Sequence, residues 1–251
     1  MSYRGRGVWY DLMTGDVEAA KAFYTEVVGW KVQEWGEGRG YSMWVAGETP
    51  VGGVTEQAGV PPHWMAHLAV EDVDAAAARA EELGGRVLTP GTDIPEVGRF
   101  AIVADPQGAS FSLFTPGGGS EAPARPETGF FEWHELHTTD HASAWEFYSA
   151  LFGWEHSSTM DMGEMGSYLI FRHPDDAEDV LTGAMFDAAK WDEKPPHWLY
   201  YVRVDDIDAA VARTRDRGGQ VLHGPMEIPG GGRMAQCLDP QGGRFALVSQ
   251  E

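Results

Sequence analysis

The order of hydrophobic and polar positions along the chain predicts short strands that alternate with helices. Residues 8–13 (VWYDLM) are typical of a strand, and residues 16–27 (DVEAAKAFYTEV) have the spacing of an amphipathic helix. Asp16 stands where a side chain caps the first turn of that helix. A second helix is expected from about Asp74 to Leu83, where a pair of glycines ends it.

Further strands follow from the same pattern. Alternating or continuous apolar runs predict strands at residues 41–46, 51–55, 63–70, 99–104 and 110–114. The sequence DPQG, which begins at Asp105, predicts the tight turn between the last two.

This whole pattern occurs twice. Residues 8–30 align with residues 132–154, which lie 124 positions later, and the PPHW and DPQG sequences recur 134 positions later. The second copy therefore carries about ten extra residues between Trp154 and Pro195. Such a repeat predicts a duplicated domain, with domains at 1–115 and 130–251 and a linker rich in Gly and Pro at 116–129.

Each copy is expected to hold two βαβββ units. The second copy repeats the strand and the helix cap of the first, with residues 133–138 (WHELHT) as a strand and Asp140 as the cap. Four such units, with mixed sheets and helices on one face, predict an α+β fold made of two tandem domains.

Composition and charge narrow the range of partners. The chain has 251 residues, of which 43% are hydrophobic, enough for a packed core. Eighteen Lys and Arg against 39 Asp and Glu give a net charge of -21, which argues against nucleic acid and anionic membranes as partners. The sequence contains no apolar leader or spanning stretch, so we expect a cytoplasmic protein. The lone Cys237 is expected to be a small buried strand residue, because it cannot form an internal disulfide.

The repeated motifs resemble those of the vicinal oxygen chelate superfamily, which contains glyoxalases, bleomycin-resistance proteins and extradiol dioxygenases. They are the D…A.AFY…GW pattern at 16–30 and 140–154, the helix starts V.DVDAA and V.DIDAA at Val70 and Val204, and the two DPQG turns. The W.[DE]L pattern of Trp9 and Trp133 is similar to that of tandem actinobacterial members. The resemblance implies that each domain curls a mixed sheet around a cavity, where metal-dependent members bind a divalent ion.

The positions that the resemblance assigns to metal ligands carry other side chains here. In the first copy they hold Trp9, Met65, Ser112 and the segment 51–54 (VGGV); in the second they hold Trp133, Leu199, Ala246 and the segment 181–185 (LTGAM). We therefore expect no bound metal and no other cofactor.

The stretch EWHELHTTD, residues 132–140, suggests a possible new metal site. In a strand His134 and His137 point to opposite faces, so they cannot chelate one ion together. His137 shares a face with Glu135, so a site of these two residues and a third group stays an alternative. His134 is expected to face the helices or a neighbouring domain.

Both copies keep an indole followed two residues later by an acid, namely Trp9 with Asp11 and Trp133 with Glu135. Strand parity places each pair on one face, where the indole could stack on a ligand and the acid could anchor its polar or cationic group. If the acid is buried, it could act as a general base. The alternative is that the indole is core packing and the acid has a structural partner.

Three more side chains are candidates for binding a ligand: His67, His137 and Tyr201. His67 and Tyr201 hold equivalent positions in the two copies, and His67 has the parity expected of the cavity face. His63 and His197 in the PPHW sequences are interpreted as structural residues at strand entries rather than as ligands.

Two functions fit these observations. One is a protein of the glyoxalase and bleomycin-resistance type that binds a small molecule in its cavities without a metal. The alternative is an enzyme, either a lyase or a hydroxylase or dioxygenase-like activity, with a remodelled site; the missing ligands favour the first. A monomer and a homodimer both fit, since four units can satisfy the pairing of the superfamily within one chain.

Overall fold

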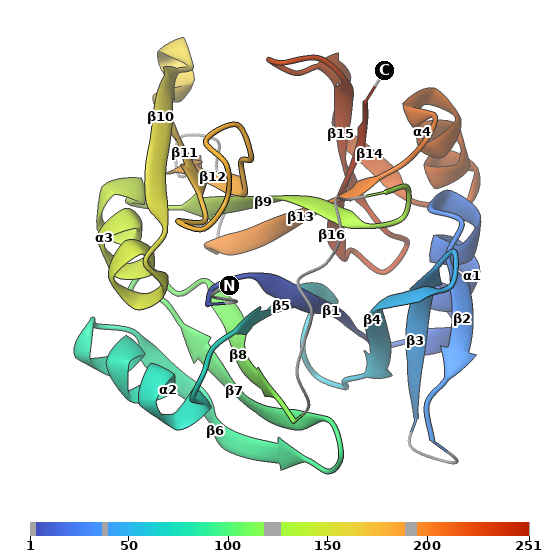
Figure 1. The fold of residues 1–251 in the computed structure, drawn as a ribbon. Helices are drawn as coiled ribbons and strands as arrows, with labels where there is room; N and C mark the ends of the chain where they lie inside the picture. Colours follow the sequence, from blue (N-terminus) through green and yellow to red (C-terminus); the bar gives the residue numbers. More distant parts are fainter. Residues whose placement is uncertain (1–3, 37–39, 118–126, 189–194, 251) are drawn as a thin grey trace. The chain divides into compact units, whose positions relative to one another are not determined.

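The computed structural model describes residues 4–36, 40–117, 127–188 and 195–250. Within these residues the strands form two eight-stranded mixed sheets, one from each sequence copy (Figure 1). The strand order is β2-β3-β4-β1-β5-β8-β7-β6 in the first copy and β10-β11-β12-β9-β13-β16-β15-β14 in the second. This confirms the predicted α+β fold. Residues 118–126 of the predicted linker lie outside the described residues.

The two copies contain the same α-helices and strands in the same order, and the second adds one 3-10 turn. The first copy contains β1 (Gly7–Thr14), α1 (Val17–Val27), β2 (Lys31–Glu34), β3 (Tyr41–Ala46), β4 (Thr49–Glu56), β5 (His63–Ala69), α2 (Val73–Glu82), β6 (Arg86–Ile94), β7 (Gly98–Ala104) and β8 (Ser110–Pro116). The second contains β9 (Phe131–Thr138), α3 (His141–Phe152), β10 (Glu155–Asp161), the 3-10 turn η1 (Gly163–Met165), β11 (Ser167–Arg172), β12 (Gly183–Asp187), β13 (His197–Arg203), α4 (Ile207–Asp216), β14 (Gln220–Glu227), β15 (Arg233–Leu238) and β16 (Arg244–Ser249). Among the described helices, none is long and apolar enough to cross a membrane.

The elements expected from periodicity are confirmed, and the structure adds the strand that follows each helix. β2 and β10 were missed because nearly all their side chains are exposed, which leaves no apolar stripe in the sequence. They are held by backbone pairing with β3 and β11. The predicted caps are correct, since Asp16 accepts a hydrogen bond from the Ala19 amide and Asp140 from the Ser143 amide.

The ten extra residues of the second copy are divided among three segments of the chain. Tyr41 and Tyr168 hold equivalent places in β3 and β11 and are 127 positions apart (168 − 41). Gly52 and Gly183, which pair with β1 and β9, are 131 positions apart (183 − 52). The offset thus rises from 124 to 134 in three steps. The first step includes a bulge inside β10, between His156 and Ser158, that β2 does not have.

The chain divides into two compact units, and each combines parts of both copies. Unit I contains the described residues of Met1–Val8, Ala66–Pro123 and His134–Trp198. Unit II contains those of Trp9–Met65, Ala124–Trp133 and Leu199–Glu251. Helices α2 and α3 pack together in unit I, as do α1 and α4 in unit II. Each unit therefore joins the second half of one copy to the first half of the other.

A buried aromatic cluster lies in each unit. In unit I, the Trp198 indole donates to the Tyr148 hydroxyl at 2.9 Å, and Tyr148 stacks on Trp154 with ring centroids 5.5 Å apart. In unit II, the Trp64 indole donates to the Tyr24 hydroxyl at 3.0 Å. The Tyr of each FYxxxxGW motif is thus the polar centre of a core, and both tyrosines are almost completely buried.

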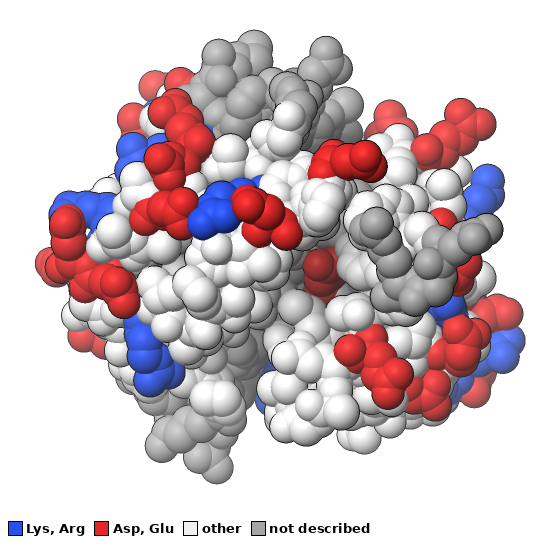
Figure 2. Space-filling model, turned by 90° about the horizontal axis from the view of Figure 1, so that it is seen from below, with Lys and Arg blue, Asp and Glu red and all other residues white. Residues whose placement is uncertain are grey.

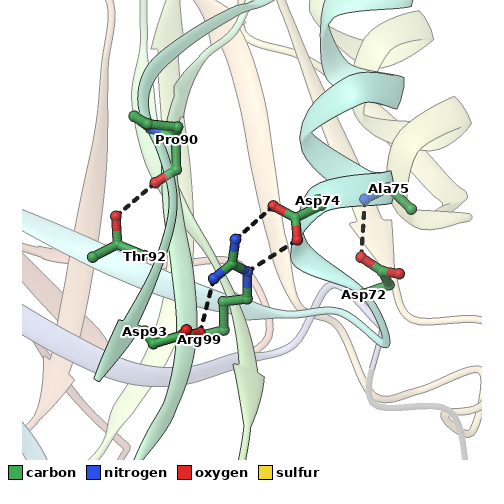
Figure 3. A network of polar contacts seen from close by, with 7 residues as sticks. All are labelled: Asp72, Asp74, Ala75, Pro90, Thr92, Asp93 and Arg99. Carbon is green, nitrogen blue, oxygen red and sulfur yellow. Dashed lines mark hydrogen bonds and ion pairs between the residues drawn. The ribbon is translucent and has the colours of Figure 1, made fainter. Parts of the chain in front are cut away.

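Arg99 of β7 forms ion pairs with Asp74 at the start of α2 and with Asp93 of β6 (Figure 3). Its Nε and Nη2 atoms each lie 3.0 Å from a different oxygen of Asp74, and Nη1 lies 2.8 Å from Asp93. Arg233 contacts Asp208 at the start of α4 in the same way, at 2.6 and 3.0 Å.

The surface is rich in acidic side chains. On the face seen in Figure 2 they are more abundant than the basic ones, in keeping with the negative net charge.

Candidate functional site

The acid of the first copy belongs to a cluster of three side chains in unit II. The hydroxyl of Tyr41 on β3 donates to Asp11 Oδ1 on β1 at 2.6 Å. The indole Nε1 of Trp9 lies 2.9 Å from the same oxygen and 2.7 Å from the Tyr41 oxygen. Trp9 and Asp11 therefore share one face of β1, as strand parity predicts. All three residues are half-buried.

Tyr41 is held as a hydrogen-bond donor. Burial raises the pKa of its phenol far above the ordinary value, and the negative charge of Asp11 raises it further. The hydroxyl consequently keeps its hydrogen at every physiological pH and presents it to Asp11.

Gly53 on β4 makes room for this bond. It pairs with Asp11 in the parallel β1–β4 ladder. A Cβ atom at this position would overlap the Tyr41 hydroxyl and would stand 2.8 Å from Asp11 Oδ1. The equivalent of Gly53 is Ala184, which pairs with Glu135. Glu135 is one methylene longer than Asp11, and it reaches Tyr168 with the methyl group of Ala184 beside it. The first copy has no room for a methyl group at the equivalent position, Gly53.

The acid of the second copy lies in unit I and has hydrogen bonds at both oxygens. Glu135 Oε2 accepts from the Tyr168 hydroxyl on β11 at 2.6 Å. Glu135 Oε1 lies 2.7 Å from His137 Nε2, two residues further along β9. Glu135 and His137 are 5% and 2% exposed, whereas Tyr168 is half-buried. The shared face predicted for Glu135 and His137 is confirmed.

Aromatic rings enclose His137. Phe186 on β12 and His197 at the start of β13 have ring centroids 4.6 and 4.7 Å from that of His137. His197 Nδ1 lies 3.0 Å from the Pro195 carbonyl, and His63 Nδ1 makes the equivalent contact with Pro61 at 2.9 Å. These contacts fit the structural interpretation of the PPHW histidines as strand-entry residues, although His197 also reaches His137.

The tyrosines are the site residues that the sequence analysis missed. Tyr41 pairs with Thr55, and Tyr168 pairs with Phe186, at corresponding places in the two antiparallel ladders. A signal was present: when Trp44 is aligned with Phe171, the two tyrosines coincide. The signal is weak because the offset between the copies changes from 124 to 134 across this segment.

Three of the positions that the resemblance assigns to metal ligands hold an apolar cluster in unit II. Leu199 and Ala246 are core members of this cluster, and Trp133 packs against it. Tyr201 belongs to the same cluster, and its hydroxyl accepts from Gln236 Nε2 at 2.8 Å. Alkyl groups and an indole do not bind a divalent cation, so the residues at these positions do not fit the metal of the superfamily. Within the described residues, no three His, Cys, Asp or Glu side chains converge as metal ligands.

The remaining candidates lie in separate surroundings. His67 in unit I is buried, with the rings of Phe114 and Phe100 at 5.9 and 6.4 Å. His134 is half-buried and its Nδ1 lies 3.1 Å from the Thr182 carbonyl; burial lowers its pKa to about 4. Cys237 is a buried residue of β15, as expected, and burial raises the pKa of its thiol to about 12.

The family model for the Glyoxalase/Bleomycin resistance protein/Dioxygenase superfamily matches residues 7–113 and 131–247. The chain therefore belongs to this superfamily, as the repeated motifs indicate. The two matched segments correspond to the two sequence copies.

Similar proteins carry two kinds of name. The chain is 35% identical to "Putative glyoxylase CFP32" of Mycobacterium bovis, over 98% of this chain and 95% of that protein. It is 32% identical to the anthracycline biosynthesis protein DauV of Streptomyces sp. strain C5, over 97% of this chain and 93% of that protein.

Solved structures share the fold at low identity. The Mn(II)-bound glyoxalase of Novosphingobium aromaticivorans superposes with a TM-score of 0.69 at 18% identity, covering 98% of this chain and 83% of that one. A homoprotocatechuate 2,3-dioxygenase variant from B. fuscum gives 0.72 at 16% identity, covering 99% and 72%. These likenesses concern the fold.

Proposed function

We propose that the protein binds a small organic molecule through a partly buried carboxylate–tyrosine pair in each copy. The observation that carries the proposal is the repeat of this pair, Asp11 with Tyr41 and Glu135 with Tyr168, at equivalent places in the two sheets. A carboxylate in a partly dehydrated site binds a cation or a hydrogen-bond donor more strongly than one in water.

The ligand class follows from the residues beside the pairs and from the names of similar proteins. Trp9 lies beside Asp11, and Phe186 and two imidazoles lie near Glu135, so flat aromatic compounds with a hydrogen-bond donor or a cationic group are the best match. An anthracycline has both features, a planar ring system and an ammonium group on its sugar. One similar protein is named for anthracycline biosynthesis, and another carries the glyoxylase name.

The test is a titration of the whole protein with daunorubicin. Binding is monitored by the fluorescence of daunorubicin and, separately, by calorimetry. The hemithioacetal of methylglyoxal with a thiol serves as a second probe. Asp11→Asn and Glu135→Gln should each weaken binding by roughly 1.5 to 3 kcal/mol in its own copy, the scale of a charged hydrogen bond. The melting temperature should stay nearly unchanged in Asp11→Asn, because the amide oxygen can still accept from Tyr41.

Glu132→Gln is the matched control. Glu132 lies on β9 as Glu135 does, but it pairs with Arg203 at 2.6 Å and with Gln250. This variant should bind the probes as the unchanged protein does. If affinity holds in the Asp11 and Glu135 variants while the melting temperature falls, the acids are structural and the proposal is wrong.

A second function, enzymatic proton transfer, is favoured by one observation. In the second copy the acid contacts an imidazole at 2.7 Å, and the first copy has Met13 at the equivalent position. Carboxylate, imidazole and phenol are the groups that proteins use as general acids and bases.

A further inference from the structure

We infer that the second copy is a proton-transfer site, in which the Tyr168 hydroxyl and Glu135 together remove a proton from the bound molecule. The inference rests on the proposed function, because the molecule must first bind there. It assigns different roles to the two copies, namely reaction in the second and binding alone in the first.

The hydrogen-bonded chain Tyr168–Glu135–His137 sets the direction of transfer. Tyr168 is half-buried, while the other two are almost completely buried, so the phenol is the group that a ligand meets. Its hydrogen points at Glu135 Oε2 over 2.6 Å. When the phenol oxygen takes a proton from the ligand, its own hydrogen can pass to Oε2 without any side chain moving.

His137 is a positioning residue in this chain. The relay needs Glu135 as an ionised carboxylate, which only accepts hydrogen bonds, so it also needs a hydrogen on His137 Nε2 in the 2.7 Å contact. That hydrogen holds Oε1 and thereby fixes the plane of the carboxylate, with Oε2 toward Tyr168. The groups around the pair include His137 from β9, Tyr168 from β11, Ala184 and Phe186 from β12 and, beyond His137, His197 from β13.

The first copy contains a different arrangement. The single oxygen Asp11 Oδ1 accepts from both Tyr41 and Trp9. The Trp9 indole also donates to the Tyr41 oxygen at 2.7 Å, which stabilises the lone pair that would have to take up a proton. Met13 stands where the second copy has His137. This copy can hold a ligand, but it lacks the imidazole that contacts the acid of the second copy.

The reaction expected of such a site is removal of an acidic C–H proton, and 5-nitrobenzisoxazole is a suitable probe. Its C–H proton moves to the Tyr168 oxygen as the phenol hydrogen moves to Glu135 Oε2. The C–H electron pair forms the nitrile, the N–O bond breaks, and the oxygen leaves as a coloured nitrophenolate. No oxidant, reductant or further reactant is needed, and the proton on Glu135 is afterwards lost to water through the same phenol.

The experiment measures kcat/KM for this probe with the full chain across pH. Glu135→Gln and Tyr168→Phe should each lower the rate at least tenfold. His137→Met, which introduces the residue of the first copy, should lower it about threefold to tenfold. It should also move the rising limb of the pH profile to higher pH, because a carboxylate that loses a hydrogen-bond donor is a stronger base. Glu132→Gln should leave both the rate and the profile unchanged.

The outcomes separate this inference from the proposed function. If daunorubicin binding is lost in Glu135→Gln but the probe reacts as fast as before, the binding role stands and the proton-transfer role is wrong. If the unchanged protein reacts with the probe no faster than Glu135→Gln does, the proton-transfer role is also wrong. Should Glu135→Gln fail to fold, Tyr168→Phe decides, because it removes one hydroxyl oxygen and keeps the ring; full activity in a folded Tyr168→Phe protein overturns the relay.

Discussion

The hydroxyl of Tyr148 donates a hydrogen bond to Asp105 Oδ2 at 3.1 Å, and it thereby joins a helix of the second copy to the DPQG turn of the first inside unit I. The other oxygen of Asp105 accepts from three backbone amides of its own turn, at 2.7 to 3.0 Å. Tyr24 and Asp239 repeat the contact in unit II at 3.1 Å. The two motifs that are most visible in the sequence are thus partners across the copies.

Tyr148→Phe should therefore destabilise the protein. The change leaves the Trp198 indole and Asp105 Oδ2 without their shared hydroxyl in a buried place, which costs about 1 to 3 kcal/mol of the free energy of unfolding. Tyr24→Phe should cost a similar amount. Urea unfolding of both single variants and the double variant is the measurement; a loss below about 0.5 kcal/mol in both would show that the bonds matter little.

Asp105→Asn should change how stability depends on pH. Burial raises the pKa of Asp105 above that of the unfolded chain. The folded state then binds the proton more tightly, so this residue contributes stability that is fully present below the unfolded pKa and is lost as pH rises through the folded pKa. Relative to the unchanged protein, Asp105→Asn should gain stability as pH rises above about 4, the ordinary pKa of Asp in an unfolded chain. A difference between the two proteins that is constant with pH would contradict this account.

His173 should make the protein sensitive to acid. It is 4% exposed, and burial together with the charge of Arg6 lowers its pKa to about 3. A lowered folded pKa means stability that is present above the unfolded value of about 6.5 and is lost as pH falls toward the folded value. At pH 5.5 the loss in the free energy of unfolding is about 1.4 kcal/mol. Only the unfolded pKa sets this amount, because His173 is still neutral in the folded protein at that pH. His173→Asn should remove this slope in unfolding curves at pH 7 and 5.5, whereas His156→Asn, at an exposed position, should keep it.

Gly53→Ala should break the contact between Tyr41 and Asp11. The added methyl group overlaps the Tyr41 hydroxyl, so the phenol must move and the bond is lost, at a cost of about 1 to 3 kcal/mol. Ala184→Gly in the second copy is the reciprocal change and should cost less than about 1 kcal/mol. In a Tyr41→Phe background, Gly53→Ala should lower the free energy of unfolding by less, because the oxygen that the methyl group overlaps is gone. If the loss is the same in both backgrounds, the overlap with Tyr41 is not its cause.

Protein purified from medium supplemented with metals should contain no stoichiometric Zn, Mn, Fe or Ni. Three positions that the resemblance assigns to metal ligands hold Trp133, Leu199 and Ala246, which lie in one apolar cluster. Elemental analysis is the measurement, with the Mn(II)-bound glyoxalase of Novosphingobium aromaticivorans as a positive control. About one equivalent of any of these metals per chain would contradict the expectation.

The sequence by itself determined the fold and part of the candidate site, because these depend on local patterns. Strand parity brought Trp9 beside Asp11 and Glu135 beside His137, since residues two apart lie on one face whatever the rest of the chain does. Helix caps such as Asp16 also depend on a few neighbouring residues.

Only the tertiary structure decided which distant residues complete each site. Tyr41 is 30 positions from Asp11 and reaches it because β3 is separated from β1 by one strand, and the short residue Gly53 on that strand leaves space. The regrouping of the copies into units I and II, with Tyr148 on Asp105, likewise rests on contacts between residues far apart in the chain. Burial of such side chains is a property of the packed core, and hydrophobic periodicity specifies that a face is buried but not which partner buries it.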